Sequence, residues 1–354
     1  MSRIIQIVGH YAYGDAIGNH INTLHRELIK REVDSRIYCV TSDKRRQGEA
    51  HELKYYDAKP DDIILYHLST GSELNRQVAE FPGKLLINYH NITPPKFFTN
   101  YHRNLEELCE QGYDDVLYLR NKVSAVVADS QYNLHELEKM GYTCPMKSIP
   151  IFMDFSDYDK APNPAVMKKY NDGKKNILFV GRIAPNKKQE DVIRAFYYYT
   201  KHLESNSRLI IVGSYNGLEQ YYLELKAYVK KLGLKNVVFT GHTSFPDILA
   251  YYRTADLFLC QSEHEGFCVP LVEAMYFGVP IVTYDSSAIG ETLGQAGVLL
   301  RDKDPMLTAT VIDCILSDEN VINQIRQHQK EELKRFDHKN VAQAYVQFLL
   351  EDAI

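Results

Sequence analysis

Two glutamates and a proline between Ser262 and Pro280 have the types and spacing of a ligand-binding loop. Glu265 lies in a glycine-containing loop, and Pro270 suits the start of a helix because its missing N–H is not needed there. Glu273 then falls near that helix start, where free backbone N–H groups favour phosphate. Carboxylates on both sides of a phosphate accept hydrogen bonds from hydroxyl groups. A sugar joined to a nucleoside by a diphosphate has this layout.

The alternative interpretation is a loop-to-helix joint with solvated carboxylates, and we accept it for Glu263. It does not suit Glu273, whose neighbours in the sequence are apolar. A carboxylate in so apolar a run needs a polar partner or a ligand. Its neighbours are Leu271, Val272, Ala274 and Met275.

This stretch resembles the donor site of the retaining glycosyltransferases of family 4, whose pattern is a Glu, seven residues and a second Glu. Glu265 and Glu273 match the pair, and Gly266 and Phe267 match the residues around it. The resemblance implies the GT-B fold and a nucleoside-diphosphate sugar as donor substrate, with no separate cofactor. It places Glu273 on the ribose and Glu265 on the transferred sugar. Cys268 stands where a Gly is frequent, and only its backbone N–H is expected to be needed.

A second candidate segment follows an apolar run that ends at Val180. It reads Gly181-Arg182 and continues to Lys187, and the two cations are expected to converge on one anion. In family 4 a Lys separated from the Gly-Arg pair by four residues contacts the donor diphosphate, which by resemblance assigns that role to Lys187, together with Arg182. Lys188 stands where the family has a Gly, and we expect it to be solvated. The alternative for Arg182 and Lys187 is two surface cations.

Ligands of open parallel sheets bind beyond the carboxyl ends of strands, and three further segments hold candidates there. His90 ends an apolar run and precedes chain-breaking residues, and it resembles the histidine that contacts the transferred sugar in this family. A lone histidine is more often structural, and His67 has a similar setting. Gly213, Ser214 and His242 follow two other apolar runs and are candidates for holding the nucleobase and the diphosphate.

The segment after the first apolar run carries Gly14 and Gly18 before a helical pattern. Backbone amides there suit a phosphate, and the segment resembles the loop that related transferases place over the donor. A simple strand-to-helix turn is the open alternative. Gly9, Gly14 and Gly18 do not have the G-x-G-x-x-G spacing, which argues against a dinucleotide fold.

Short apolar runs alternate with helical patterns along all 354 residues, which predicts parallel sheets covered on both faces. We expect two doubly wound, Rossmann-like α/β domains of the GT-B type facing each other across a cleft. Residues 1–160 form the acceptor-side domain, 175–335 the donor domain, and 336–354 a helix that packs back on the first domain. The predicted strands are 4–10, 36–41, 62–69, 84–91, 125–130, 147–151, 176–183, 208–214, 236–242, 257–262, 281–286 and 297–300.

Composition narrows the possible partners. A net charge of −5 gives no reason to expect nucleic acid, and the six cysteines form no C-x-x-C pair, so we predict no metal site. There is no leader pattern and no long apolar run, which predicts a cytoplasmic protein. The basic run at residues 44–46 leaves peripheral contact with the inner face of a membrane as a possibility.

The sequence therefore predicts a metal-independent, retaining hexosyltransferase for polysaccharide biosynthesis. Its partners would be a nucleotide-sugar donor and a saccharide or lipid-linked acceptor. The catalytic groups would be Glu265, His90, Arg182 and Lys187. The alternatives are a nucleotide-sugar epimerase or phosphorylase on the same fold, a silent binding subunit of a glycosyltransferase complex, and an NAD-dependent oxidoreductase.

Overall fold

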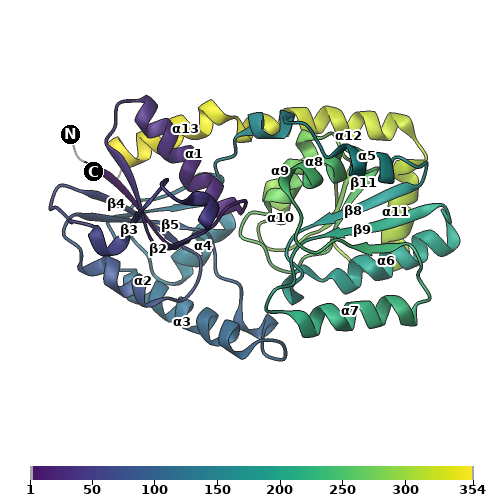
Figure 1. The fold of residues 1–354 in the computed structure, drawn as a ribbon, viewed down its shortest axis with the longest axis horizontal. Coiled ribbons are helices and arrows are strands. Elements are labelled where there is room, and N and C mark those ends of the chain that lie inside the picture. The colour runs from purple at the N-terminus through teal and green to yellow at the C-terminus, as the bar shows by residue number, and fades with distance from the viewer. Residues whose placement is uncertain (1–2, 353–354) are drawn as a thin grey trace. The chain divides into compact units, whose positions relative to one another are not determined.

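The computed structural model describes residues 3–352, which form two compact units. Unit 1 comprises residues 3–96, 104–154 and 336–352, and unit 2 comprises residues 97–103 and 155–335. Each unit is a parallel sheet with helices on its faces (Figure 1). This is the pair of doubly wound domains that the alternating sequence predicts.

The sheet of unit 1 has seven parallel strands in the order β3-β2-β1-β4-β5-β6-β7. The chain order reverses between β1 and β4, so the loops after these two strands are neighbours. The strands are β1 (Ile4–Tyr11), β2 (Ser35–Ser42), β3 (His51–Glu52), β4 (Ile63–Leu68), β5 (Lys84–Tyr89), β6 (Ala125–Ala128) and β7 (Met146–Ser148). The main helices are α1 (Ala16–Lys30), α2 (Glu73–Gln77), α3 (Arg103–Leu119), α4 (Gln131–Lys139) and α13 (His338–Gln347).

The sheet of unit 2 has six parallel strands in the order β10-β9-β8-β11-β12-β13, and here the order reverses between β8 and β11. The strands are β8 (Lys175–Val180), β9 (Ser207–Val212), β10 (Val237–Phe239), β11 (Leu257–Cys260), β12 (Ile281–Tyr284) and β13 (Val298–Leu300). The helices are α5 (Pro164–Tyr170), α6 (Gln189–His202), α7 (Glu219–Lys231), α8 (Phe245–Thr254), α9 (Val269–Tyr276), α10 (Ile289–Leu293), α11 (Pro305–Leu316) and α12 (Glu319–Glu332).

The strands form where the sequence is apolar without interruption, because both faces of each sheet are covered. Every residue of β4 and of β11 is buried. In register, Leu65 of β4 pairs with Leu86 of β5, and both lie in the core of unit 1. The strand centres therefore hold the sheets together, and the polar residues follow at the strand ends.

Helix α13 belongs to unit 1, where it lies beside α1 (Figure 1, yellow and purple). Its Val341 and Tyr345 join the apolar core of that unit with Leu24 of α1. His338 Nε2 lies 3.0 Å from the carboxylate of Glu27 on α1, which adds a polar contact between the two helices. The sequence near the end of the chain thus completes the first unit.

The border between the units differs from the expected one at residue 160, because the first unit ends at Asp154. The following turn, Phe155–Asp159, packs into unit 2: the Tyr158 ring contacts Phe245 and Tyr276. Residues 97–103 also join unit 2, where the Tyr101 ring lies against Tyr221. Aromatic ring contacts thus accompany both segments where they join unit 2.

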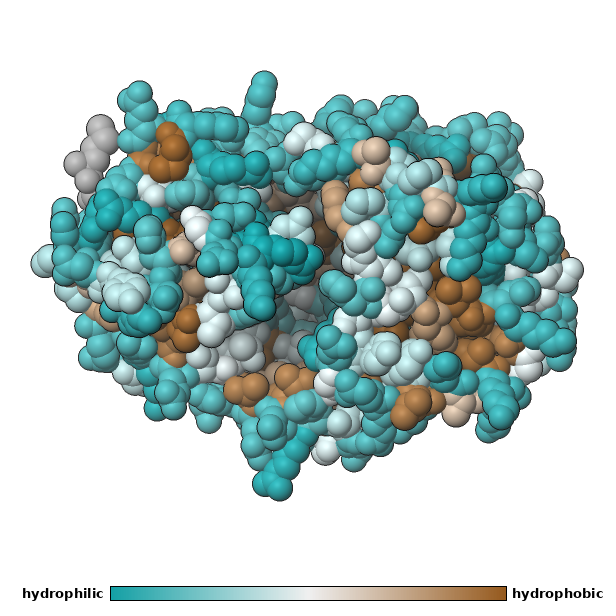
Figure 2. All heavy atoms as spheres, in the orientation of Figure 1, coloured by the Kyte–Doolittle hydropathy of each residue, from teal (hydrophilic) through white to brown (hydrophobic). Residues whose placement is uncertain are grey.

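Figure 2 shows one face of the molecule as mostly hydrophilic, with hydrophobic residues in small separate groups. Within residues 3–352, no helix has the length and apolar character needed to cross a membrane.

Candidate active site

The loops after β8 and β11 are joined in unit 2. Since these strands pair, their loops leave the sheet side by side. The Glu263 N–H donates to the Asn186 carbonyl at 2.8 Å, and the Asn186 side-chain amide donates to the His264 carbonyl at 3.1 Å. Asn186 is buried and was not a candidate from the sequence. It fixes the two loops at the residues next to Lys187 and Glu265.

Lys187 and Glu265 form an ion pair, with Nζ 2.5 Å from a carboxylate oxygen. Their side chains are 21% and 10% exposed, so the pair is mostly enclosed but keeps a path to solvent. Burial by itself lowers the pKa of Lys187, but the Glu265 carboxylate outweighs it and raises that pKa above its usual value. Lys187 is therefore a fixed cation at the end of the central strands.

The backbone around Glu265 is held by hydroxyl groups from the segment after β12. The Glu265 N–H donates to Ser287 Oγ at 2.8 Å, and Ser286 Oγ donates to the Ser262 carbonyl at 2.7 Å. Thr292 Oγ1 donates to the Phe267 carbonyl at 2.5 Å. The sequence analysis missed these supports, although two adjacent serines just beyond a mostly buried strand were a visible signal.

Helix α9 begins beyond this loop as the sequence predicts, with Pro270 in its first turn. Its N-cap residue, Cys268, has a left-handed backbone (φ 75°) and makes no side-chain capping bond. That conformation explains why glycine suits this position in the family that the sequence resembles. Without a side-chain cap, the positive end of the helix dipole faces the loop.

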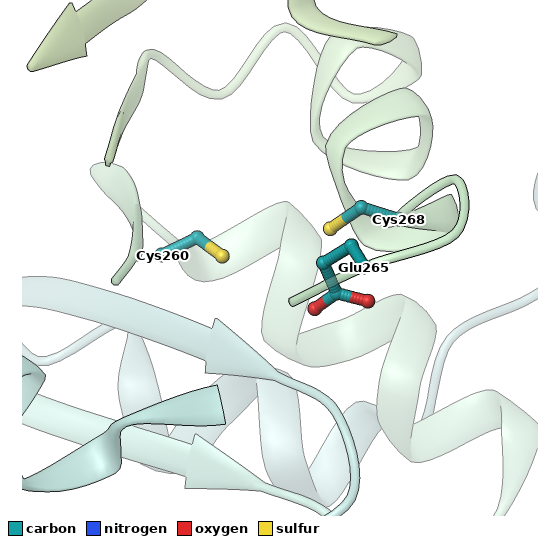
Figure 3. Close-up of side chains that lie close together, drawn as sticks. All are labelled: Cys260, Glu265 and Cys268. Carbon is teal, nitrogen blue, oxygen red and sulfur yellow. The ribbon is translucent and has the colours of Figure 1, made fainter. Parts of the chain in front are cut away.

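Two thiols lie beside Glu265. The sulfurs of Cys260 and Cys268 and a carboxylate oxygen of Glu265 all lie within 4.8 Å of one another (Figure 3). The hydrogen bond from the Cys268 thiol lowers the pKa of Cys260 to about 7, against the opposing effect of burial. Among residues 3–352, these three side chains form a group that could hold a metal ion, and the sequence analysis did not predict it.

Glu273 has the polar partners that its apolar surroundings require. Tyr252 donates a hydrogen bond to one carboxylate oxygen at 2.7 Å, and Tyr158 donates to the other at 3.0 Å. Burial raises the pKa of Glu273, although both tyrosine hydrogen bonds act against that rise. A carboxylate offers about four acceptor positions, so two tyrosines leave capacity for ligand hydroxyls.

Arg182 lies near the loop after β9 and donates to the Asn216 carbonyl at 3.2 Å. Ser214 Oγ accepts from the Asn216 N–H at 3.2 Å, which shapes the same loop. A Cβ on Gly213 would come within 1.9 Å of the Gly181 carbonyl oxygen, so the two strand ends pass too closely for a side chain.

His242 is exposed after β10. Lys188 contacts the carboxylates of Glu190 and Glu263 at 3.5 and 3.6 Å, so it is ion-paired where simple solvation was expected.

In unit 1, the loop with Gly14 and Gly18 caps α1. Asp15 Oδ1 accepts the Gly18 N–H at 2.6 Å, which occupies one amide expected to face a phosphate. Burial raises the pKa of Asp15. A Cβ on Gly18 would lie 2.1 Å from the Ala12 carbonyl oxygen, so this glycine is required by close packing. The segment forms the turn between β1 and α1, and its contact with a donor phosphate stays a prediction.

His90 is expected from the sequence to contact a sugar, but its imidazole is buried, with a side-chain exposure of 2%. Its Nδ1 lies 2.8 Å from Asp129 Oδ2, and its Nε2 lies 3.0 Å from His67 Nδ1. Both ring nitrogens are therefore engaged within unit 1. His67 continues the network to Gln6 at 3.1 Å.

The same network reaches the last helix. The Asn88 side-chain amide donates to Asp129 at 3.2 Å, and its oxygen accepts from Tyr345 of α13 at 3.0 Å. His20 also contacts the Asn88 oxygen at 3.0 Å. We call His20, His67, His90, Asn88, Asp129 and Tyr345 the histidine network. It joins α1, β4, β5 and α13 within unit 1.

Comparison with known protein families finds one match, and it falls within unit 2. The family described as "Glycosyl transferases group 1" matches residues 165–333, which include Arg182, Lys187, Glu265 and Glu273. Residues 165–333, most of unit 2, are therefore similar to the group 1 glycosyl transferases. The donor-site resemblance noted in the sequence and the family match coincide on the same segment.

The chain is also similar in sequence to individual glycosyltransferases. The chain is 32% identical over 183 residues to an uncharacterised glycosyltransferase of Methanocaldococcus jannaschii, covering 49% of this chain and 44% of that protein. It is 25% identical over 349 residues to the serotype-specific mannosyltransferase WbdA of Escherichia coli, covering 92% of this chain and 42% of WbdA. The chain thus spans less than half the length of these relatives.

The whole fold is shared with solved structures. Anabaena HepE, solved with UDP and glucose, has a TM-score of 0.78 at 18% identity, with 99% of both chains covered. WaaG, a glycosyltransferase involved in lipopolysaccharide biosynthesis, has a TM-score of 0.70 at 13% identity, with 98% of this chain and 100% of WaaG covered. These likenesses confirm the GT-B fold class.

Proposed function

We propose that this group 1 glycosyltransferase moves a hexose from a nucleoside-diphosphate sugar to a saccharide or lipid-linked acceptor, with retention of the anomeric configuration. The observation that carries the proposal is the Lys187–Glu265 ion pair at 2.5 Å, directly before the N-terminus of α9. A cation suited to a diphosphate and a carboxylate suited to a sugar hydroxyl would then lie side by side. In a nucleotide sugar, a single bond joins the diphosphate to the sugar.

Each group has a role that follows from its charge. Lys187, Arg182 and the positive end of α9 would neutralise the charge that develops on the leaving diphosphate, an electrostatic form of catalysis. Glu265 would accept hydrogen bonds from the sugar hydroxyls and orient the anomeric carbon. Glu273, positioned by Tyr158 and Tyr252, would accept hydrogen bonds from the ribose.

Retention would follow from front-face attack, in which the departing phosphate takes the proton of the acceptor. A double displacement is the mechanistic alternative. The proposed diphosphate contacts carry positive charge without a metal ion. Transfer should therefore survive chelation by EDTA. Loss of activity in EDTA with recovery on adding Mg²⁺ or Mn²⁺ would contradict metal independence.

The donor and acceptor are defined by chemistry. HepE has been solved with UDP-glucose, and WbdA is named a mannosyltransferase, so a uridine or guanosine diphosphate hexose is a reasonable first donor to test. Peripheral membrane contact would be confined to few basic groups. Arg46 is buried and bonded to Asn19, and Arg45 pairs with Asp43.

The test begins with binding. UDP, GDP, ADP and their hexose derivatives are screened by thermal unfolding, where a ligand at one hundred times its Kd stabilises by about 2.7 kcal/mol. The stabilising donor is then incubated with oligosaccharide and lipid-linked acceptors, and NMR reads the anomeric configuration of the product. Transfer with retention is expected. Isomerised donor formed without an acceptor would point to an epimerase, and binding without turnover on any acceptor would favour a silent subunit.

A further inference from the structure

Cys260, Glu265 and Cys268 converge from three successive pieces of chain in unit 2. Cys260 ends β11, Glu265 lies in the following loop, and Cys268 occupies the N-cap position of α9. Figure 3 shows the two sulfurs turned toward each other with the carboxylate beside them. Their three ligand atoms lie within 4.8 Å of one another, and the three residues are at most 9% exposed. None of the proposed steps of sugar transfer uses a thiol.

We propose that these three side chains form a binding site for one thiophilic divalent cation, of the Zn²⁺ or Cd²⁺ class. Two thiolates and a carboxylate are ligands that Zn²⁺ accepts, at about 2.3 Å to sulfur and about 2.0–2.2 Å to oxygen. Tetrahedral ligands at those distances lie roughly 3.5–3.8 Å apart, so side-chain adjustments suffice to reach them from the observed spacing. Thiolates favour such soft ions over Mg²⁺ and Mn²⁺.

Charge favours the same assignment. When the ion binds, the two thiols release two protons. The divalent ion together with two thiolates and one carboxylate then carries a net charge of −1. The Lys187 ammonium, 2.5 Å from Glu265, offsets that charge, so the enclosed cluster is neutral. A buried group of charges is tolerated only when its members compensate one another in this way.

The loop that carries the ligands is fixed before any ion arrives. Glu265 is held through its N–H by Ser287, and the carbonyl of Phe267, next to Cys268, is held by Thr292. Ser262 Oγ lies 3.3 Å from Cys260 Sγ and adds an oxygen near the three ligands. Preorganised ligands lose little conformational entropy when they bind.

The cation would compete with sugar transfer. It would take the Glu265 carboxylate that, under the proposed function, orients the sugar. Zn²⁺ should therefore inhibit transfer while a bare nucleoside diphosphate still binds. This consequence rests on the proposed function, whereas the ion site itself does not.

The first experiment titrates the whole chain with Cd²⁺, in a phosphine reductant that keeps the cysteines as thiols, and follows the sulfur-to-cadmium charge-transfer absorbance. One Cd²⁺ per chain is expected, and excess Mg²⁺ should not displace it. Cys260→Ser and Cys268→Ser should each weaken binding at least tenfold. Cys314→Ser is the matched control, since Cys314 is exposed on α11, and it should bind as the parent chain does. Equal affinity in Cys260→Ser and Cys314→Ser would overturn the site.

A second measurement needs no variant and so remains valid if a serine substitution prevents folding. The native chain is alkylated slowly with and without Cd²⁺, and mass spectrometry reads each cysteine. The ion should slow labelling of Cys260 and Cys268 and leave Cys314 unchanged. Unchanged rates at both buried cysteines would overturn the site. If both are protected but transfer is not inhibited, the ion site stands and the proposed role of Glu265 in holding the sugar is wrong.

Discussion

The two units carry polar side chains at the ends of their central strands but use them differently. In unit 1, His67 near the end of β4 and His90 after β5 are sealed into the histidine network with Asp129. In unit 2, Lys187 after β8 and Glu265 after β11 form a charge pair that remains partly exposed. The polar groups of the histidine network thus find their partners within unit 1, whereas the Lys187–Glu265 pair of unit 2 keeps 21% and 10% of its two side chains exposed.

The difference teaches that a position behind a parallel strand is not sufficient to identify a ligand-binding residue. His90 and Glu265 both follow buried strands. His90 has partners at both ring nitrogens, and the network behind it reaches Tyr345 of the last helix. Its geometry suits holding α13 on unit 1. The accessible charge pair of unit 2 suits a ligand.

The largest effect is expected at Lys187. Lys187→Met keeps most of the length of the side chain but removes the cation beside Glu265, so the site would hold an unpaired carboxylate where the diphosphate is proposed to bind. Charge-assisted contacts of this kind contribute about 1.5–3 kcal/mol. Calorimetry should therefore show at least tenfold weaker binding of the preferred nucleoside diphosphate, with a matching loss of turnover.

Lys188→Met is the matched control, because Lys188 is the next residue and pairs with Glu190 and Glu263 instead. It should bind the diphosphate nearly as the parent chain does. If both variants lose affinity equally, a general loss of positive charge explains the result, and the specific role of Lys187 is contradicted.

The next effect separates the two glutamates. Glu273→Ala should weaken a nucleotide sugar and the bare diphosphate together, because the ribose is present in both. Glu265→Ala should leave the bare diphosphate bound and chiefly lower turnover, because poorly oriented reactants lose the advantage of proximity. Calorimetry with both ligands on both variants measures this, and circular dichroism checks folding. Loss of diphosphate binding in a folded Glu265→Ala chain would show that the roles are assigned wrongly.

The sequence predicted more of the fold than of the contacts within the site. The fold follows from apolar runs because strands covered on both faces must be apolar throughout. Strand β3 was missed since it consists of only two exposed polar residues, His51 and Glu52. The predicted strand 257–262 ends early, at Cys260, because Gln261 and Ser262 already belong to the loop toward Glu265.

In the site, the loops with Lys187 and Glu265 were predictable, but their direct ion pair was not. The partners of Glu273 were hidden for a different reason. Tyr158 lies 115 residues away in the sequence, at the end of the segment expected to form the first domain, and it is one of 26 tyrosines. Nothing local distinguishes it. The sequence shows that Glu273 needs a partner, and only the folded chain shows which residue supplies it.

A smaller effect tests the role of the histidine network. His90→Ala removes one partner of Asp129 and one partner of His67. Leaving the buried atoms that faced His90 unsatisfied costs about 1–3 kcal/mol. Hydrogen exchange should show faster opening of β5, β6 and α13, while diphosphate affinity in unit 2 stays unchanged.

The control for His90 is His10→Ala in the same unit. His10 is exposed, and its ring contacts the hydroxyl of Thr41 at 2.8 Å. A surface substitution of this kind should alter stability by no more than about 0.5 kcal/mol. If His90→Ala leaves exchange unchanged but abolishes turnover, the histidine contacts the sugar as the family resemblance implies, and the contrast between the units fails at this residue.

The smallest effect concerns the attachment of α13 and depends on pH. Burial opposes ionisation of Glu27, but hydrogen bonds from Lys30, His338 and Arg31 prevail and lower the pKa of its carboxyl to about 2. A folded pKa below the unfolded value of about 4.3 stabilises the native state above that value. This stability is lost as the pH falls from there toward 2. Because the cationic partners are partly exposed, the contribution should be no more than about 1 kcal/mol.

Glu27→Gln should therefore be less stable than the parent chain at neutral pH, and the difference should shrink on acidification through that window. Hydrogen exchange of α13 at several pH values measures it, because His338 joins Glu27 to that helix. Glu138→Gln, at an exposed position on α4, is the control and should show no such convergence. A difference that stays constant from pH 7 to pH 3 would mean that Glu27 acts through packing. In that case the histidine network and the apolar face of α13 alone would hold the helix on unit 1.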